Sequence, residues 1–105
     1  MIIELRRFEG CPSWEDGLLN LKQALAEEGI TAEVRVVLVE TDEDAQRLQF
    51  LGSPSFIVDG KDLWPEQRER YSLSCRVYET PQGLRGVPTV GMLRVRLRQR
   101  LIGKG

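Results

Sequence analysis

The chain has 105 residues, of which 41% are hydrophobic and 30% are charged, and its formal net charge is −1. At this length we expect one domain, residues 1–105, with a core of its own. The composition excludes a disordered chain, and no apolar run approaches the roughly 18 residues of a membrane-spanning helix. The first residues lack the basic and apolar pattern of a secretion signal, so we expect a cytoplasmic protein with no membrane partner.

Histidine is absent, and there are two cysteines, Cys11 and Cys75. Without an imidazole, Ser-His-Asp and Cys-His catalysis are excluded, and two thiols cannot form a four-cysteine zinc site. We expect no resident metal and no cofactor. In a reducing cytoplasm the two thiols are not expected to form a permanent disulfide. Any chemistry must therefore use thiols, carboxylates or arginines.

The first half of the chain predicts a strand, a helix and a second strand. Residues 2–8 and 32–39 are rich in β-forming side chains, and the second run has the β-branched character of a buried strand. Between them, residues 12–28 show the apolar spacing of a helix. Pro12 suits a first helical turn, so we expect this helix to start at Cys11.

A second helix and a third strand follow. Thr41, with three acidic residues after it, is a typical helix start, and this helix is expected to end near Leu51. Residues 55–58 are predicted to form a strand that follows Pro54. The Asp59-Gly60 pair after them favours a hairpin turn.

Residues 71–79 alternate in character and predict a fourth strand. Leu73, Cys75 and Val77 share one face of it, which is the more apolar face. This strand is expected to pair with the strand at residues 55–58. Cys75 is then either a small core side chain or a second reactive thiol.

The C-terminal segment fits a helix after Pro88-Thr89. The predicted order is β-α-β-α-β-β-α, which makes an α/β protein with a four-stranded mixed sheet and helices on both faces, a three-layer α/β/α sandwich. Four arginines of the last helix, at positions 94, 96, 98 and 100, are interpreted as a solvated helix face. No aromatic residue lies between them to stack on bases, so we expect no nucleic-acid partner.

The residues Gly10 to Trp14 and the segment from Ser53 to Gly60, with this element order, resemble the thioredoxin fold and most closely the glutaredoxins. The resemblance covers roughly residues 2–80. Cys-Pro-x-Trp, Gly-Ser-Pro and Ser-Cys-Arg-x-Tyr motifs make the chain similar to small bacterial thioredoxin-like proteins, some labelled alkylmercury-lyase-like. The resemblance implies that Cys11 is the reactive thiol and that Pro54 is a cis-proline opposite it. It also implies that the backbone of Ser53 is open to an extended substrate.

An independent argument supports Cys11. A cysteine in the first turn of a helix faces unpaired N–H groups and the positive end of the helix dipole, both of which stabilise a thiolate. The alternative is a buried structural cysteine. Where the family has the second cysteine of its Cys-x-x-Cys pair, this chain has Trp14, so the usual resolving thiol is missing.

Three functions remain open. The first is an atypical glutaredoxin-like or thioredoxin-like redox protein, a candidate thiol–disulfide oxidoreductase, with Cys11 as nucleophile and Cys75 or an external thiol resolving. Its substrate would be a thiol or disulfide, glutathione or a protein, contacted by residues Pro12, Ser13, Trp14, Ser53 and Pro54. The second is a soft-metal or organomercurial binder using both cysteines. The third is a non-catalytic interaction module that needs neither.

Overall fold

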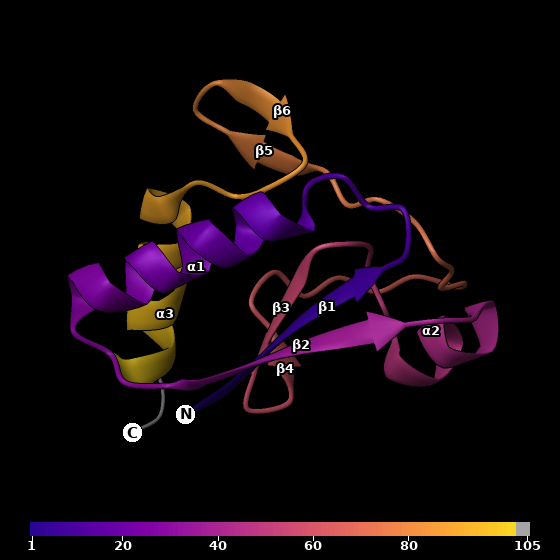
Figure 1. Ribbon diagram of the computed structural model, residues 1–105, viewed down its shortest axis with the longest axis horizontal. Coiled ribbons are helices and arrows are strands. Elements are labelled where there is room, and N and C mark those ends of the chain that lie inside the picture. The colour runs from indigo at the N-terminus through magenta and orange to yellow at the C-terminus, as the bar shows by residue number, and fades with distance from the viewer. Residues whose placement is uncertain (103–105) are drawn as a thin grey trace.

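A computed structural model describes residues 1–102 (Figure 1). The elements are β1 (Ile2–Phe8), α1 (Trp14–Glu28), β2 (Glu33–Val39), α2 (Asp42–Leu48), β3 (Ser55–Val58), β4 (Lys61–Asp62), β5 (Tyr78–Thr80), β6 (Gly83–Arg85) and α3 (Val90–Ile102). Four strands form one mixed sheet in the order β2-β1-β3-β4, and β5 and β6 form a separate hairpin. The expected α/β protein with three helices and a four-stranded mixed sheet is confirmed.

The main core lies between the sheet and the pair α1 and α3. Strand β1 runs parallel to β2 and antiparallel to β3. Because side chains alternate along a strand, Ile3 and Leu5 point to one face of the sheet. They are fully buried there with Leu21 of α1 and Leu93 of α3. This packing explains the apolar spacing of the first helix.

Helix α2 packs on the opposite face, at the carboxyl ends of β1 and β2. Its N-cap is Thr41, as expected, and the Thr41 side chain accepts a hydrogen bond from the backbone N–H of Asp44 at 3.0 Å. Val39, Ala45 and Phe50 form a second small core beneath it. The helix ends at Leu48 rather than near Leu51, because the next residue adopts a left-handed conformation.

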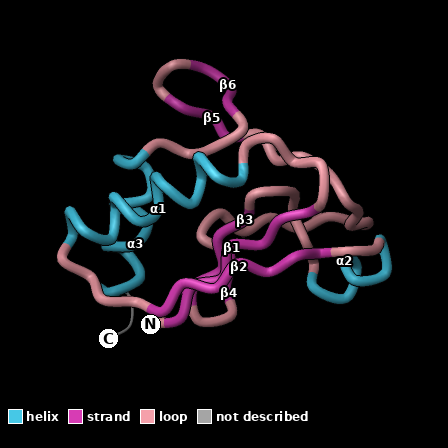
Figure 2. Tube along the Cα trace, viewed as in Figure 1, coloured by secondary structure: helices cyan, strands magenta, loops and turns pink. Residues whose placement is uncertain are grey.

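The predicted fourth strand is wrong. Residues 61–62, not residues 71–79, pair with β3 as β4. The Asp59-Gly60 turn has positive φ at both residues (48° and 88°), so it returns the chain at once to the edge of β3. Residues 64–77 leave the sheet, and one isolated bridge joins Cys75 to Ser53 in the loop before β3. The chain then enters the β5–β6 hairpin (Figure 2).

The arginines of α3 were expected to form a solvated face, but three of the four form hydrogen bonds with other parts of the protein, and Arg96 lies over the ring of Trp64. Hydrogen bonds from Arg98 and Arg94 lower the pKa of the Glu28 carboxyl at the end of α1. Arg100 donates to backbone carbonyls on both sides of the β3–β4 turn. The forked guanidinium groups thus fasten α3 to its neighbours. None of the helices in residues 1–102 is long and apolar enough to cross a membrane.

Candidate functional site

Cys11 lies in the turn between β1 and α1. Its backbone N–H donates to the carbonyl of Phe8 at 3.3 Å, and the residue is 6% exposed. The helix expected to start at Cys11 begins at Trp14, after the N-cap Ser13, so that expectation was wrong. The chain uses Gly10, whose φ is 95°, and the next three residues to turn from the sheet into the helix. Cys11 is therefore outside the first helical turn.

The thiol of Cys11 bonds to Ser53 rather than to the helix. Its Sγ donates to the backbone carbonyl of Ser53 at 3.5 Å. A carbonyl oxygen accepts from a protonated thiol and not from a thiolate. The helix N-terminus, which we expected to activate Cys11, is not the partner of this thiol in the reduced protein.

Ser53 and Pro54 belong to a buried loop that enters β3. The peptide bond between them is cis, as expected. Pro54 packs against α1 at Gly17, where an added Cβ would lie 3.0 Å from Cγ of Pro54 and 3.3 Å from Cζ of Phe56. Gly17 thus allows the helix to approach the loop closely. We call Gly52–Pro54 the proline loop.

We expected the backbone of Ser53 to be open to a substrate, but the structure shows that it is already paired. Its N–H donates to the carbonyl of Ser74 at 2.8 Å, and its carbonyl accepts from the N–H of Arg76 at 3.0 Å. Ser53 is thereby paired with Cys75 in a parallel bridge. A segment of the same chain occupies this edge because it needs no bimolecular association to reach it.

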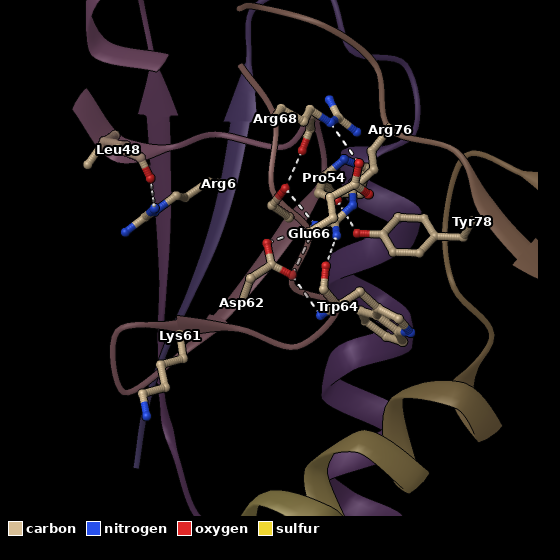
Figure 3. Close-up of polar contacts among 12 residues, drawn as sticks. Arg6, Leu48, Pro54, Lys61, Asp62, Trp64, Glu66, Arg68, Arg76 and Tyr78 are labelled. Carbon is tan, nitrogen blue, oxygen red and sulfur yellow. Dashed lines mark hydrogen bonds and ion pairs between the residues drawn. The ribbon is translucent and has the colours of Figure 1, made fainter. Parts of the chain in front are cut away.

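Residues Ser74–Tyr78, here called the anchored segment, are held by two buried side chains (Figure 3). Arg76 donates to the Asp62 carboxylate at 2.9 Å, to Oγ of Ser55 and to the carbonyl of Trp64. The hydroxyl of Tyr78 donates to the carbonyl of Pro54 at 2.6 Å. Burial raises the pKa of the Tyr78 phenol above its ordinary value, against the opposing effect of Arg76, so the hydroxyl stays a donor.

The proline loop and the anchored segment fit closely because position 52 is a glycine. Its φ is 118°, and an added Cβ would lie 2.9 Å from Cβ of Arg76 and 3.0 Å from the Arg76 backbone. Any other side chain at Gly52 would push the two segments apart. Two of the three sequence motifs noted above thus dock directly on one another.

Cys75 lies on the outward side of the anchored segment. From Cys75 to Tyr78 the residues alternate between exposed and buried, with Val77 62% exposed and Arg76 and Tyr78 inside. The predicted sharing of a face by Cys75 and Val77 is consistent with this alternation, but that face points away from the core. The interpretation of Cys75 as a small core side chain is therefore wrong.

The other predicted site residues lie at the start of α1. Pro12 is exposed, and Ser13 packs against the exit of the hairpin, where a Cβ on Gly86 would lie 2.7 Å from Oγ of Ser13. The ring of Trp14 lies under the guanidinium of Arg7, 4.3 Å from it. The structure thus gathers Cys11, the proline loop and Cys75, while Ser13 and Trp14 have other partners.

Sequence reasoning assigned no role to Arg76, Tyr78, Asp62 or Gly52. The available signal was the Ser-Cys-Arg-x-Tyr motif, in which Arg76 and Tyr78 stand two residues apart and so share a face of an extended chain. A buried arginine needs an acidic partner, and Asp62 lies outside the motif. This partner could not be read from the motif itself.

Comparisons with known proteins give no relative. No family model matches the chain, and no curated protein or solved structure matches it significantly. A function is therefore inferred from the geometry of Cys11, Ser53 and Cys75.

Proposed function

We propose that the protein is a thioredoxin-like thiol–disulfide exchange protein in which Cys11 and Cys75 act as a pair. Several features support this proposal. The four-stranded mixed sheet, the position of Cys11 after β1 and the cis-Pro54 before β3 agree with what the resemblance implies. Cys75 would replace the resolving cysteine that is missing at Trp14.

The observation that carries the proposal is that both cysteines lie next to Ser53, Cys11 through its thiol and Cys75 through backbone pairing. Sγ of Cys11 is 3.5 Å from the carbonyl oxygen of Ser53, and Cys75 is the bridge partner of the same residue. Paired strand positions lie about 5 Å apart. A disulfide needs the Cα atoms of its two cysteines within about 7 Å of one another. Two cysteines that both lie next to one residue are therefore good candidates for forming a disulfide.

The proposed reaction needs two thiols and one disulfide substrate. One protein thiolate attacks a substrate R–S–S–R′, forms a mixed disulfide with R and releases R′–S⁻. The second protein thiolate attacks the protein sulfur of that mixed disulfide, forms the Cys11–Cys75 disulfide and releases R–S⁻. Two electrons pass to the substrate, and the two thiol protons go to the released thiolates. A thiol reductant such as glutathione returns the electrons.

The test is oxidation of the reduced protein with glutathione disulfide, followed by mass spectrometry. The wild type is expected to lose two hydrogens and to give one peptide pair joined through Cys11 and Cys75. Cys11→Ser and Cys75→Ser should each retain one glutathione instead. A wild type that accumulates two glutathione adducts, with no joined peptides, would contradict the proposal.

A site for a soft metal ion is the second candidate, because the same two thiols could clamp one ion. Within residues 1–102 there is no group of three or more cysteine and acidic side chains that could hold a metal. Two thiolates would suit an ion that accepts two ligands, such as mercuric ion or an organomercurial. Titration should then saturate at one ion per chain and fail in either serine variant.

The third function, a non-catalytic interaction module, needs neither cysteine. A Cys11→Ser, Cys75→Ser double variant that keeps partner binding would favour it over the other two.

A further inference from the structure

We infer that Cys75, and not Cys11, is the thiol that attacks the substrate, and that the cavity beside Val77 receives an apolar side chain of a peptide disulfide. This inference rests on the proposed function and adds its order of events. It reverses the roles that the sequence gave to the two cysteines. Cys11 then becomes the resolving thiol.

The first argument is access to sulfur. Thiol–disulfide exchange requires the attacking sulfur to line up with the S–S bond of the substrate, so a covered thiol reacts slowly. Cys11 is 6% exposed and its Sγ is bonded to Ser53, whereas Cys75 is exposed. A disulfide on another molecule would meet Cys75 first.

The second argument is that Cys75 is exposed without being loose. Arg76 and Tyr78 point inward and hold the chain on both sides of Val77. The backbone groups that bond to Ser53 are the carbonyl of Ser74 and the N–H of Arg76. In an extended chain the N–H and carbonyl of Cys75 then face the other edge, where an extended peptide could pair with them.

The third argument is the cavity of about 440 Å³ next to this segment, a size typical of ligand sites. One part of its wall is apolar and is formed by Val77, Met92, Val95 and the ring of Trp64. The rest is polar and is formed by Tyr78 and the charged residues Glu66, Arg76, Glu79 and Arg96. Val77 is two residues from Cys75 on the same outward side, which corresponds to about 7 Å. A peptide bound through its cysteine could place a neighbouring apolar side chain here.

The order of bonds follows. The Cys75 thiolate attacks the peptide disulfide, forms Cys75–S–S–R and releases R′–S⁻. Cys11 then gives up its hydrogen bond to Ser53 and transfers its proton to the departing thiolate. Its sulfur attacks the sulfur of Cys75, which forms the Cys11–Cys75 disulfide and releases R–S⁻. Electrons and protons balance as in the proposed reaction.

The order is tested with dithiobis(nitrobenzoate), by following the release of thionitrobenzoate from the reduced single-cysteine variants. Cys11→Ser, which keeps Cys75, should react as fast as the fast phase of the wild type. Cys75→Ser should react at least about tenfold more slowly, and unfolding in urea should remove this difference. Equal rates in the folded variants, or a faster Cys75→Ser, would overturn the inference.

The same reagent separates this inference from the proposed function. The wild type should release two thionitrobenzoates for each reagent molecule and retain none, because Cys11 displaces the second. If the wild type retains the adduct on Cys75, the proposed function fails, but Cys75 is still the attacking thiol. If the wild type forms the Cys11–Cys75 disulfide but Cys75→Ser reacts faster than Cys11→Ser, this inference fails and the proposed function stands.

The cavity is tested with a disulfide-linked peptide that carries leucine two residues from its cysteine. Val95→Asp should slow the reaction of this peptide several-fold more than it slows the reaction with dithiobis(nitrobenzoate). Val36→Asp on β2 is a matched control, since Val36 is 44% exposed and Val95 is 48% exposed. If the wild type and Val95→Asp react with this peptide at equal rates, the cavity does not bind the substrate.

Discussion

The two cysteines are held in place in opposite ways. Cys11 is itself buried, in a turn whose hydrogen bonds run to Phe8 and Ser53. Cys75 is exposed, and the chain around it is fixed because Arg76 and Tyr78 are buried. The difference teaches that a thiol can be exposed and still be held in a fixed position, when the side chains next to it in the sequence are buried. Changes at those neighbours should therefore release the segment that carries Cys75 from Ser53.

The largest effect is expected from loss of the buried ion pair. Arg76→Met would leave the Asp62 carboxylate, whose side chain is 12% exposed, without its cation. An unpaired buried charge costs about 3–5 kcal/mol, so the free energy of unfolding should fall by that amount in a urea titration. The anchored segment should also leave Ser53, and alkylation of Cys11 should become faster.

The control for this variant is Arg68→Met. It removes the pair between Arg68 and Glu66, whose side chains are 37% and 49% exposed. Exposed pairs contribute less than about 1 kcal/mol, so this change should be small. The double variant Arg76→Met, Asp62→Leu should regain part of the lost stability. If Arg76→Met unfolds at the wild-type urea concentration, the anchor is not what holds Cys75.

A smaller effect is expected from Gly52→Ala, which tests the fit between the proline loop and the anchored segment. The new methyl group would collide with Arg76. Gly60→Ala is the control, since Gly60 also has a positive φ (88°) but has no neighbour within 4 Å of an added Cβ. Both variants place alanine at a positive φ and lose stability for that reason. At position 52 the collision should lower the free energy of unfolding by about 1–3 kcal/mol more, which is the cost of overpacking. Equal loss of stability in the two variants would show that the close contact is unimportant.

The smallest effect is expected from Tyr78→Phe, which removes the hydrogen bond to Pro54. The free energy of unfolding should fall by about 1–2 kcal/mol at neutral pH. Because burial raises the pKa of Tyr78, the folded protein keeps a proton that the unfolded chain releases above about pH 10. Wild-type stability should therefore fall as the pH rises past that value, and Tyr78→Phe should lack this part of the fall. Parallel pH curves for the two proteins would contradict it.

Where local signals are strong, the sequence predicted the structure well. The strands at residues 2–8 and 55–58 have the predicted bounds, and the Thr41 cap is also confirmed. Each of these depends on neighbouring residues, through apolar spacing or a capping side chain. The cis bond before Pro54, which the resemblance implied and local spacing did not, is confirmed as well. The helix α1 begins at Trp14 and not at Cys11, and this error has a local cause as well. The turn that starts at Gly10 includes Cys11, Pro12 and Ser13, which had been assigned to the helix.

The sequence by itself determined that Cys75 and Val77 share one side of an extended segment, since alternation depends on backbone geometry alone. It could not determine which side faces the core. The tertiary structure decided this, because the buried side chain of Arg76 needs the Asp62 carboxylate, and the hydroxyl of Tyr78 needs the carbonyl of Pro54. These partners come from β4 and from the proline loop, and apolar character alone would have placed Cys75 inside. The cysteine that pattern alone would bury is thus the one that the fold exposes.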